Sequence, residues 1–155
     1  MIQRIQSIYL LLATIVISIL LFSQVAIFTD SSAHIFNLSF KGFSQFVNNG
    51  WLLKYRCYLM DCIILLTLAA SVISIFYFKN RKEQIKICWL QIILNLLILL
   101  SFYYEINIAK VHFLLSCSSL YITTILPVIA IILVYLAIKA IKKDEDLVRS
   151  MDRIR

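Results

Sequence analysis

The sequence is poor in the residues that build soluble domains. Only 15% of its 155 residues are charged, and it has two glycines and one proline, whereas a soluble domain carries roughly 25% charged residues. So few glycines leave little room for a phosphate-binding loop or a loop-rich catalytic domain. The chain is mostly apolar instead, with 62% hydrophobic residues and a mean hydropathy of +0.92. This composition predicts a membrane protein.

Cysteine and histidine are scarce, and their spacing suggests no metal site. None of the four cysteines belongs to a CxxC pair, and neither histidine stands near enough in sequence to suggest a metal motif. Cys57 and Cys117 both fall near the outer face of the predicted topology, so a disulfide between them is geometrically possible. Buried thiols that pack as small apolar residues are the alternative. We expect no metal and no cofactor.

The charged residues do not assemble into a catalytic constellation. We find no Ser/His/Asp, Cys/His or paired-carboxylate arrangement, and we therefore expect no enzyme and no catalytic residues. The net charge of +7 could suggest nucleic acid, but the basic residues lie beside apolar segments. Membrane topology and lipid headgroups explain them better.

Four apolar segments are long enough to cross a bilayer, which takes about 20 helical residues. A signal peptide is the competing interpretation of the first segment, because Ser31 and Ala33 resemble a cleavage site, but its apolar core is too long for an h-region. We expect one integral membrane domain over residues 1–155, an all-α bundle of four transmembrane helices. The spans cover about residues 8–28, 57–78, 87–104 and 119–138.

The connection over residues 29–56 is the longest stretch between spans. From Phe36 to Phe40 every second residue is apolar, which is the period of a half-buried strand. Asn49-Gly50 is a turn signal. A small β-hairpin that covers the outer ends of the helices is one interpretation. An irregular amphipathic loop on the membrane interface is the other.

Basic residues set the predicted orientation. Arg4, the connection over residues 79–86 and the tail over residues 139–155 hold eleven of the 15 lysines and arginines. The positive-inside rule therefore places both termini in the cytoplasm, and the connections 29–56 and 105–118 outside.

Asp61 is the one ionisable residue within the predicted spans, near the outer end of the second. An ionisable residue in a membrane suggests a function. We favour an interfacial salt bridge with Lys54 or Arg56 over a proton or ion site.

Uncharged polar residues recur at helical spacing on the second and third spans. Hydrogen bonds between antiparallel neighbours would satisfy them, at roughly 0.6–2 kcal/mol each, and a polar substrate pathway is the alternative. With Asp61, they form a predicted set of intramembrane packing residues: Thr67, Ser71, Ser74, Gln91 and Asn95.

The tail over residues 139–155 continues the fourth span without glycine or proline, so we expect a cytoplasmic helix. Its charges are interleaved at spacings that stabilise an exposed helix. An apolar stripe on one face must lie on lipid, pack on the protein itself or dock a partner. Arg4 could meet Asp144 or Glu145 there. The candidate partner-docking residues are Arg4, Ile141, Leu147, Val148, Met151 and Ile154.

The two termini carry the motifs MIQRIQSIYLLLA and LAIKAIKKDEDLVRSMDRIR. In combination they resemble an uncharacterised family of small four-span inner-membrane proteins in Bacteroidota (domain of unknown function 4293). The resemblance implies a location in the bacterial inner membrane. It implies no activity and no catalytic residues.

These features favour a small non-enzymatic accessory or assembly protein whose cytoplasmic termini engage a larger membrane complex. A small transporter or channel component with a polar path between the helices is the alternative. The expected partners are membrane lipids and other inner-membrane proteins or further copies of the chain. We expect no binding of nucleic acid.

Overall fold

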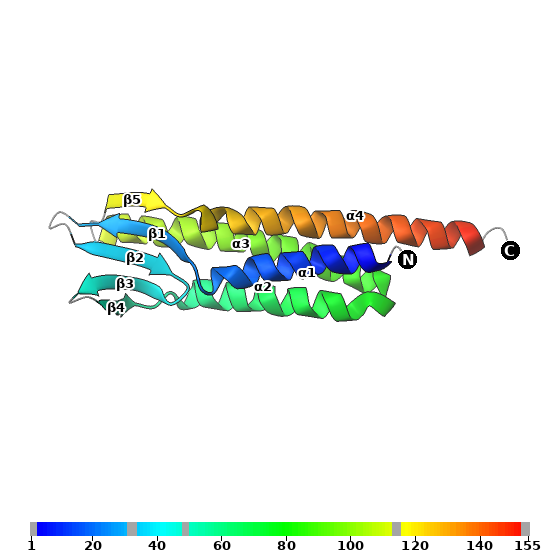
Figure 1. Ribbon diagram of the computed structural model, residues 1–155, viewed down its shortest axis with the longest axis horizontal. Helices are drawn as coiled ribbons and strands as arrows, with labels where there is room; N and C mark the ends of the chain where they lie inside the picture. The colour runs from blue at the N-terminus through cyan, green and yellow to red at the C-terminus, as the bar shows by residue number, and fades with distance from the viewer. Residues whose placement is uncertain (1–2, 31–33, 48–49, 113–115, 153–155) are drawn as a thin grey trace.

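The computed structural model describes residues 3–30, 34–47, 50–112 and 116–152. Figure 1 shows an elongated molecule in which the α-helices lie side by side and a sheet occupies one end. Two short 3-10 helices, η1 (Tyr77–Lys79) and η2 (Ile122–Ile125), precede the last two α-helices. The α-helices are α1 (Gln3–Leu20), α2 (Tyr58–Phe76), α3 (Arg81–His112) and α4 (Leu126–Asp152).

The predicted all-α four-helix bundle, with at most a small hairpin, is wrong. The described residues also form a five-stranded antiparallel sheet with the order β4-β3-β2-β1-β5. Three of its strands come from the first connection, where at most a hairpin was expected. The strands are β1 (Gln24–Thr29), β2 (Ile35–Ser39), β3 (Gly42–Val47), β4 (Gly50–Tyr55) and β5 (Ser116–Leu120).

The other two strands overlap segments that were predicted to be transmembrane helices. α1 ends at Leu20, and the remainder of the first predicted span turns into β1. β5 begins in the second outer connection and runs into the start of the fourth predicted span. A short apolar run fits a buried strand as well as a helix, so its periodicity alone does not separate the two. Hydrogen-bonded pairing makes this segment a strand, because β1 lies between β2 and β5 in the sheet.

One face of the sheet packs on the helices. Ala26, Phe28 and Leu38 are buried and share a core with Met60 of α2 and Phe102 of α3. α3 has 32 residues, which at 1.5 Å per residue gives about 48 Å. The hydrocarbon core of a bilayer is about 30 Å thick. α3 is therefore long enough to cross a membrane and also to reach the sheet, and Figure 1 shows it extending to the end of the molecule where the sheet lies.

Among the described residues, three helical segments are long and apolar enough to cross a membrane, and the apolar part of α1, Ile5–Leu20, is shorter. Large exposed apolar side chains on the helices, such as Leu66 and Ile93, suit a surface in contact with lipid. These features are compatible with a membrane location, while the orientation of the helices stays a prediction. The three segments are Tyr58–Phe76, Arg81–Val111 and Ile122–Asp146.

Candidate functional site

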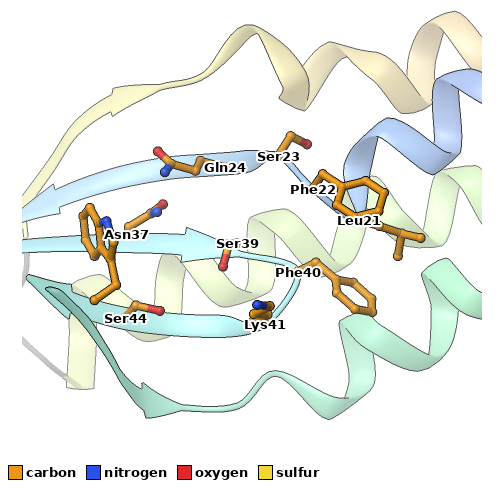
Figure 2. A pocket seen from close by; sticks show the side chains of 10 residues that line it. Leu21, Phe22, Ser23, Gln24, Asn37, Ser39, Phe40, Lys41 and Ser44 are labelled. Atoms are coloured by element: carbon orange, nitrogen blue, oxygen red, sulfur yellow. The ribbon is translucent and has the colours of Figure 1, made fainter.

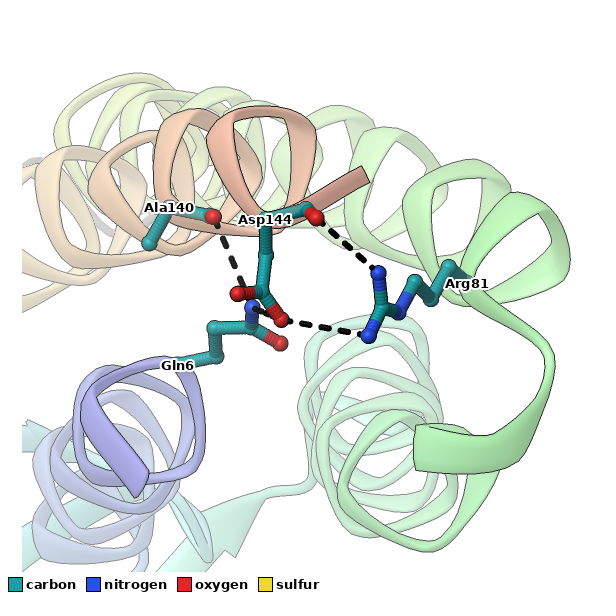
Figure 3. A network of polar contacts seen from close by, with 4 residues as sticks. All are labelled: Gln6, Arg81, Ala140 and Asp144. Carbon is teal, nitrogen blue, oxygen red and sulfur yellow. Dashed lines mark hydrogen bonds and ion pairs between the residues drawn. The ribbon is translucent and has the colours of Figure 1, made fainter. Parts of the chain in front are cut away.

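A polar clasp, defined as Gln6, Arg81 and Asp144, joins three helices at the end of the bundle away from the sheet. Gln6 Nε2 of α1 donates a hydrogen bond of 3.1 Å to Asp144 Oδ2 of α4. Arg81, the first residue of α3, places Nη2 3.3 Å from the same oxygen. Its Nη1 donates to the Asp144 carbonyl oxygen over 3.1 Å. Figure 3 shows Gln6 and Arg81 converging on Asp144 from two helices.

The clasp holds a carboxylate away from water. The side chain of Asp144 is 10% exposed and that of Arg81 23% exposed. A charge at such a position needs partners, because removing one partner of a buried ion pair leaves an uncompensated charge. Charge-assisted hydrogen bonds are also the strongest kind. The clasp therefore fixes the base of the tail against α1 and the start of α3.

Ile141, one turn before Asp144, packs inside the helix bundle. Its side chain is fully buried, and it shares a core with Leu10 and Ala13 of α1 and with Ala137 of α4. Although Ile141 belongs to the predicted docking stripe, it offers no exposed surface to a partner. One end of the stripe therefore packs on the protein's own first helix.

The rest of the predicted stripe lies farther along the chain. Leu147, Val148 and Met151 fall on the helical backbone of α4, but their side chains lie outside the described part of the structure. The side chain of Arg4 and all of Ile154 also lie outside it. Figure 1 shows α4 continuing past the ends of the other helices. The docking role of this segment stays a prediction.

The uncharged polar residues predicted to pack within the bundle are buried on α2 and α3, and we call this set the polar seam. The three hydroxyl groups on α2 donate to carbonyl oxygens of their own helix over 2.7–2.8 Å. A hydrogen bond between the helices comes from Gln84, which the sequence did not single out: its Nε2 donates to the Ser74 carbonyl oxygen over 3.0 Å. The fully buried seam residues are Thr67, Ser71, Ser74, Gln91 and Asn95.

The two amides of the seam keep unpaired atoms. Asn95 Nδ2 donates to the Gln91 carbonyl oxygen over 2.8 Å. Within the described residues, neither polar atom of the Gln91 amide nor Asn95 Oδ1 has a hydrogen-bond partner. Leaving such an atom unsatisfied costs about 1–3 kcal/mol. These amides are therefore the strongest sign of a polar role inside the bundle.

Asp61 lies in the first turn of α2, where its Oδ2 is 3.5 Å from Arg56 Nε. The side chain of Asp61 is 10% exposed and that of Arg56 55% exposed. The pair thus lies at the rim of the bundle, where the arginine reaches solvent. Oδ1 of Asp61 has no hydrogen-bond partner among the described residues.

Glu105 is a buried acid that sequence reasoning missed, because it was assigned to an outer connection. α3 continues to His112, and Glu105 is 3% exposed. The Cys57 thiol donates a hydrogen bond to it. Cys57 is a free cysteine, and the side chain of Cys117, its possible disulfide partner in the sequence analysis, lies outside the described part of the structure.

Metal ligation has no support in the part of the chain that the structure describes. There, no group of three or more histidine, cysteine, aspartate or glutamate side chains is arranged to hold a metal ion. The buried polar groups of the clasp and the seam instead join helices or lie unpaired between them.

A protein-family model described as "Domain of unknown function (DUF4293)" matches residues 2–154. No curated protein and no solved structure matches the chain.

Proposed function

Because the chain belongs to the DUF4293 family, whose description assigns no activity, we propose a function from the geometry. We propose that it is a small non-enzymatic accessory or assembly protein, a four-span protein of the bacterial inner membrane in Bacteroidota. Its cytoplasmic tail binds a larger membrane complex.

The end of α4 carries this proposal. The helix runs to Asp152, the clasp holds it at Asp144, and Figure 1 shows it passing the ends of the other helices. A segment that is already helical as far as Asp152 and fixed at its base loses less conformational entropy when it binds a partner. We therefore define residues 147–155 as the arm and assign docking to it.

Removal of the arm tests the proposal. Deleting residues 147–155 leaves Asp144 and the clasp in place, so the bundle should keep its thermal stability in mild detergent. Proteins that co-purify in stoichiometric amounts with the full-length chain should be lost from the truncated one. Quantitative mass spectrometry of matched purifications measures this loss.

The matched control replaces the arm with a glycine–serine segment of equal length. It keeps the chain length but removes the helix and its side chains, so we expect it to behave like the deletion. Stoichiometric partners that stay bound to both variants would contradict an arm-mediated function. A full-length chain that carries no partner in membranes from its native host would contradict it too.

A transporter or channel component is the second candidate, and the unpaired amides of Gln91 and Asn95 favour it. The test introduces Gln91→Cys into a chain whose own cysteines have been replaced. If a polar path follows the seam, the new thiol should react with a water-soluble methanethiosulfonate reagent. Ile93 lies on the exposed apolar surface of the same helix, and Ile93→Cys provides the lipid-facing control. Protection at both positions would oppose a path.

A further inference from the structure

A second polar site lies on the face of the sheet turned away from the helices. It is a pocket of about 280 Å³ over β1, β2 and β3, beside the end of α1. Figure 2 shows the side chains of Gln24, Asn37, Ser39 and Ser44 on this face. The pocket lies far from the arm and the clasp, so a role for it is independent of the proposed function.

The register of the sheet explains why polar side chains gather there. Gln24 lies opposite Ser39, and Asn37 lies opposite Ser44. Residues directly opposite each other in an antiparallel pair share a face, and so do residues two apart on one strand. Trp51 lies opposite Phe46, two residues beyond Ser44, and thus joins the same face. The alternate residues, such as Phe36 and Leu38, face the helices.

Asn37 has the chemistry of a binding residue. It is 5% exposed, it lines the pocket, and its Oδ1 has no hydrogen-bond partner within the described residues. The Oγ atom of Ser23, also in the pocket lining, is buried and unpaired within the same residues. A buried acceptor without a donor is costly. A ligand that brings a hydroxyl donor to Asn37 removes that cost.

Trp51 supplies an apolar surface beside these polar groups. Its side chain is 47% exposed, and Phe46 holds its ring in an edge-on contact with the ring centroids 5.2 Å apart. An aromatic ring next to amides and hydroxyls suits a ligand with one apolar face and a polar rim.

The charges of the pocket select among polar ligands. Lys41 is the only ionisable residue in the described lining, and it is exposed. A single exposed lysine supplies only a point charge, and among the described residues the lining has neither an arginine cluster nor a helix N-terminus, the usual features of strong phosphate sites. The groups present are hydroxyls, amides and an aromatic ring, which match a neutral ligand rich in hydroxyl groups.

We propose that this pocket binds a sugar ring, either as a free glycoside or as the headgroup of a glycolipid. The C–H face of the ring stacks on Trp51, and its hydroxyls donate to Asn37 Oδ1 and exchange hydrogen bonds with Ser44 and Gln24. At the α1 end the lining becomes apolar through Leu21, Phe22 and Phe40, and Phe22 is 91% exposed. That end receives the aglycone or the lipid chain.

Tryptophan fluorescence tests the proposal on the full-length chain in phosphatidylethanolamine nanodiscs. The sequence has two tryptophans, so Trp89→Phe leaves Trp51 as the single emitting tryptophan. The free probes are methyl β-glucopyranoside and methyl N-acetyl-β-glucosaminide, and the lipid probe is monoglucosyl diacylglycerol. We expect a saturable change in Trp51 emission with at least one of them. Binding of a free glycoside would identify a soluble sugar as the ligand, and binding of the glycolipid alone would identify a lipid headgroup. Either result would support the proposed sugar pocket.

Variants on the two faces of one strand give the decisive comparison. Ser44→Ala and Asn37→Leu should each weaken binding about 10-fold, since a lost hydrogen bond of about 1.4 kcal/mol corresponds to that factor. Gln45→Ala, the neighbour of Ser44 on the opposite face, should bind like the parent. Thermal unfolding checks that each variant folds. If Asn37→Leu does not fold, Ser44→Ala alone provides the test of binding.

Three outcomes would overturn the proposal. The first is no saturable change with any of the three probes. The second is unchanged affinity in a folded Ser44→Ala or Asn37→Leu variant. The third is inorganic phosphate competing as strongly as the glycosides, which would assign the pocket to an anion.

Discussion

At the residue scale, Asp144 and Gln91 show two outcomes for polar side chains in this bundle. Asp144 is charged, and Gln6 and Arg81 supply it with partners from two other helices. Gln91 is uncharged and fully buried, and its amide is unpaired among the described residues. The charged residue is the one whose partners the fold provides, because an unpaired buried charge costs more than an unpaired amide.

We predict that Arg81→Met lowers the free energy of unfolding by about 1–3 kcal/mol, because it leaves Asp144 without its cation. Asp144→Asn should cost less, and the double variant should be more stable than the sum of the two single effects predicts. Denaturant titration in detergent micelles measures all three.

Lys86→Met is the matched control. It removes a lysine from the same helix. Lys86 forms an ion pair of 2.8 Å with Glu83, but the side chain of Lys86 is 72% exposed and that of Glu83 is 50% exposed. An exposed pair contributes about 0–1 kcal/mol, so the variant should unfold close to the parent. If Arg81→Met and Lys86→Met lowered the free energy of unfolding equally, the clasp would have no special role in stability.

At the element scale, the turn between β2 and β3 depends on one glycine. Gly42 has a φ of +110°, a conformation that residues with a Cβ rarely adopt. A Cβ at this position would clash with the Tyr55 carbonyl oxygen and lie 2.9 Å from Arg56 Cα. The turn and the end of β4 therefore pack backbone against backbone.

Gly42→Ala should consequently destabilise the protein by roughly 2–4 kcal/mol, from backbone strain and the clash together. Gly50→Ala is the comparison, because the nearest atom to its Cβ would be the Val47 carbonyl oxygen at an ordinary 3.8 Å. Its effect should stay within about 0.5 kcal/mol. Thermal melts followed by circular dichroism would decide, and similar melting temperatures for the two variants would contradict the prediction.

At the scale of the whole molecule, the sheet and the clasp lie at opposite ends of the helices (Figure 1). The basic connection between α2 and α3 lies at the clasp end. If the positive-inside rule holds for this chain, the sheet lies outside the cytoplasm. The sugar pocket and the docking arm would then face different compartments.

Reporter fusions test that arrangement. Alkaline phosphatase fused after Tyr55 should be active, and the same enzyme fused after Asn80 should be inactive. Green fluorescent protein fused after Asn80 or after Arg155 should fluoresce, because it matures in the cytoplasm. The reverse pattern would invert the topology and place the sheet inside.

The sequence by itself determined the apolar composition, the family motifs and the apolar segments compatible with a membrane location, because hydropathy is a local property that survives in any fold. It also identified polar positions such as Asp61 and Gln91, since an amide or acid in an apolar run is visible without coordinates. It did not predict β1 or β5, because a short apolar run becomes a strand only when a partner pairs with it.

Only the tertiary structure decided the sheet, the clasp and the pocket. Gln6 and Asp144 are 138 residues apart, and β1 pairs with β5 from the other end of the chain. Ile141 is buried in a core that it shares with Leu10 and Ala13 of α1, and Asn37 and Ser44 share a face through the register of two strands. Each of these features depends on contacts between distant segments, which composition, periodicity and spacing along the chain do not contain.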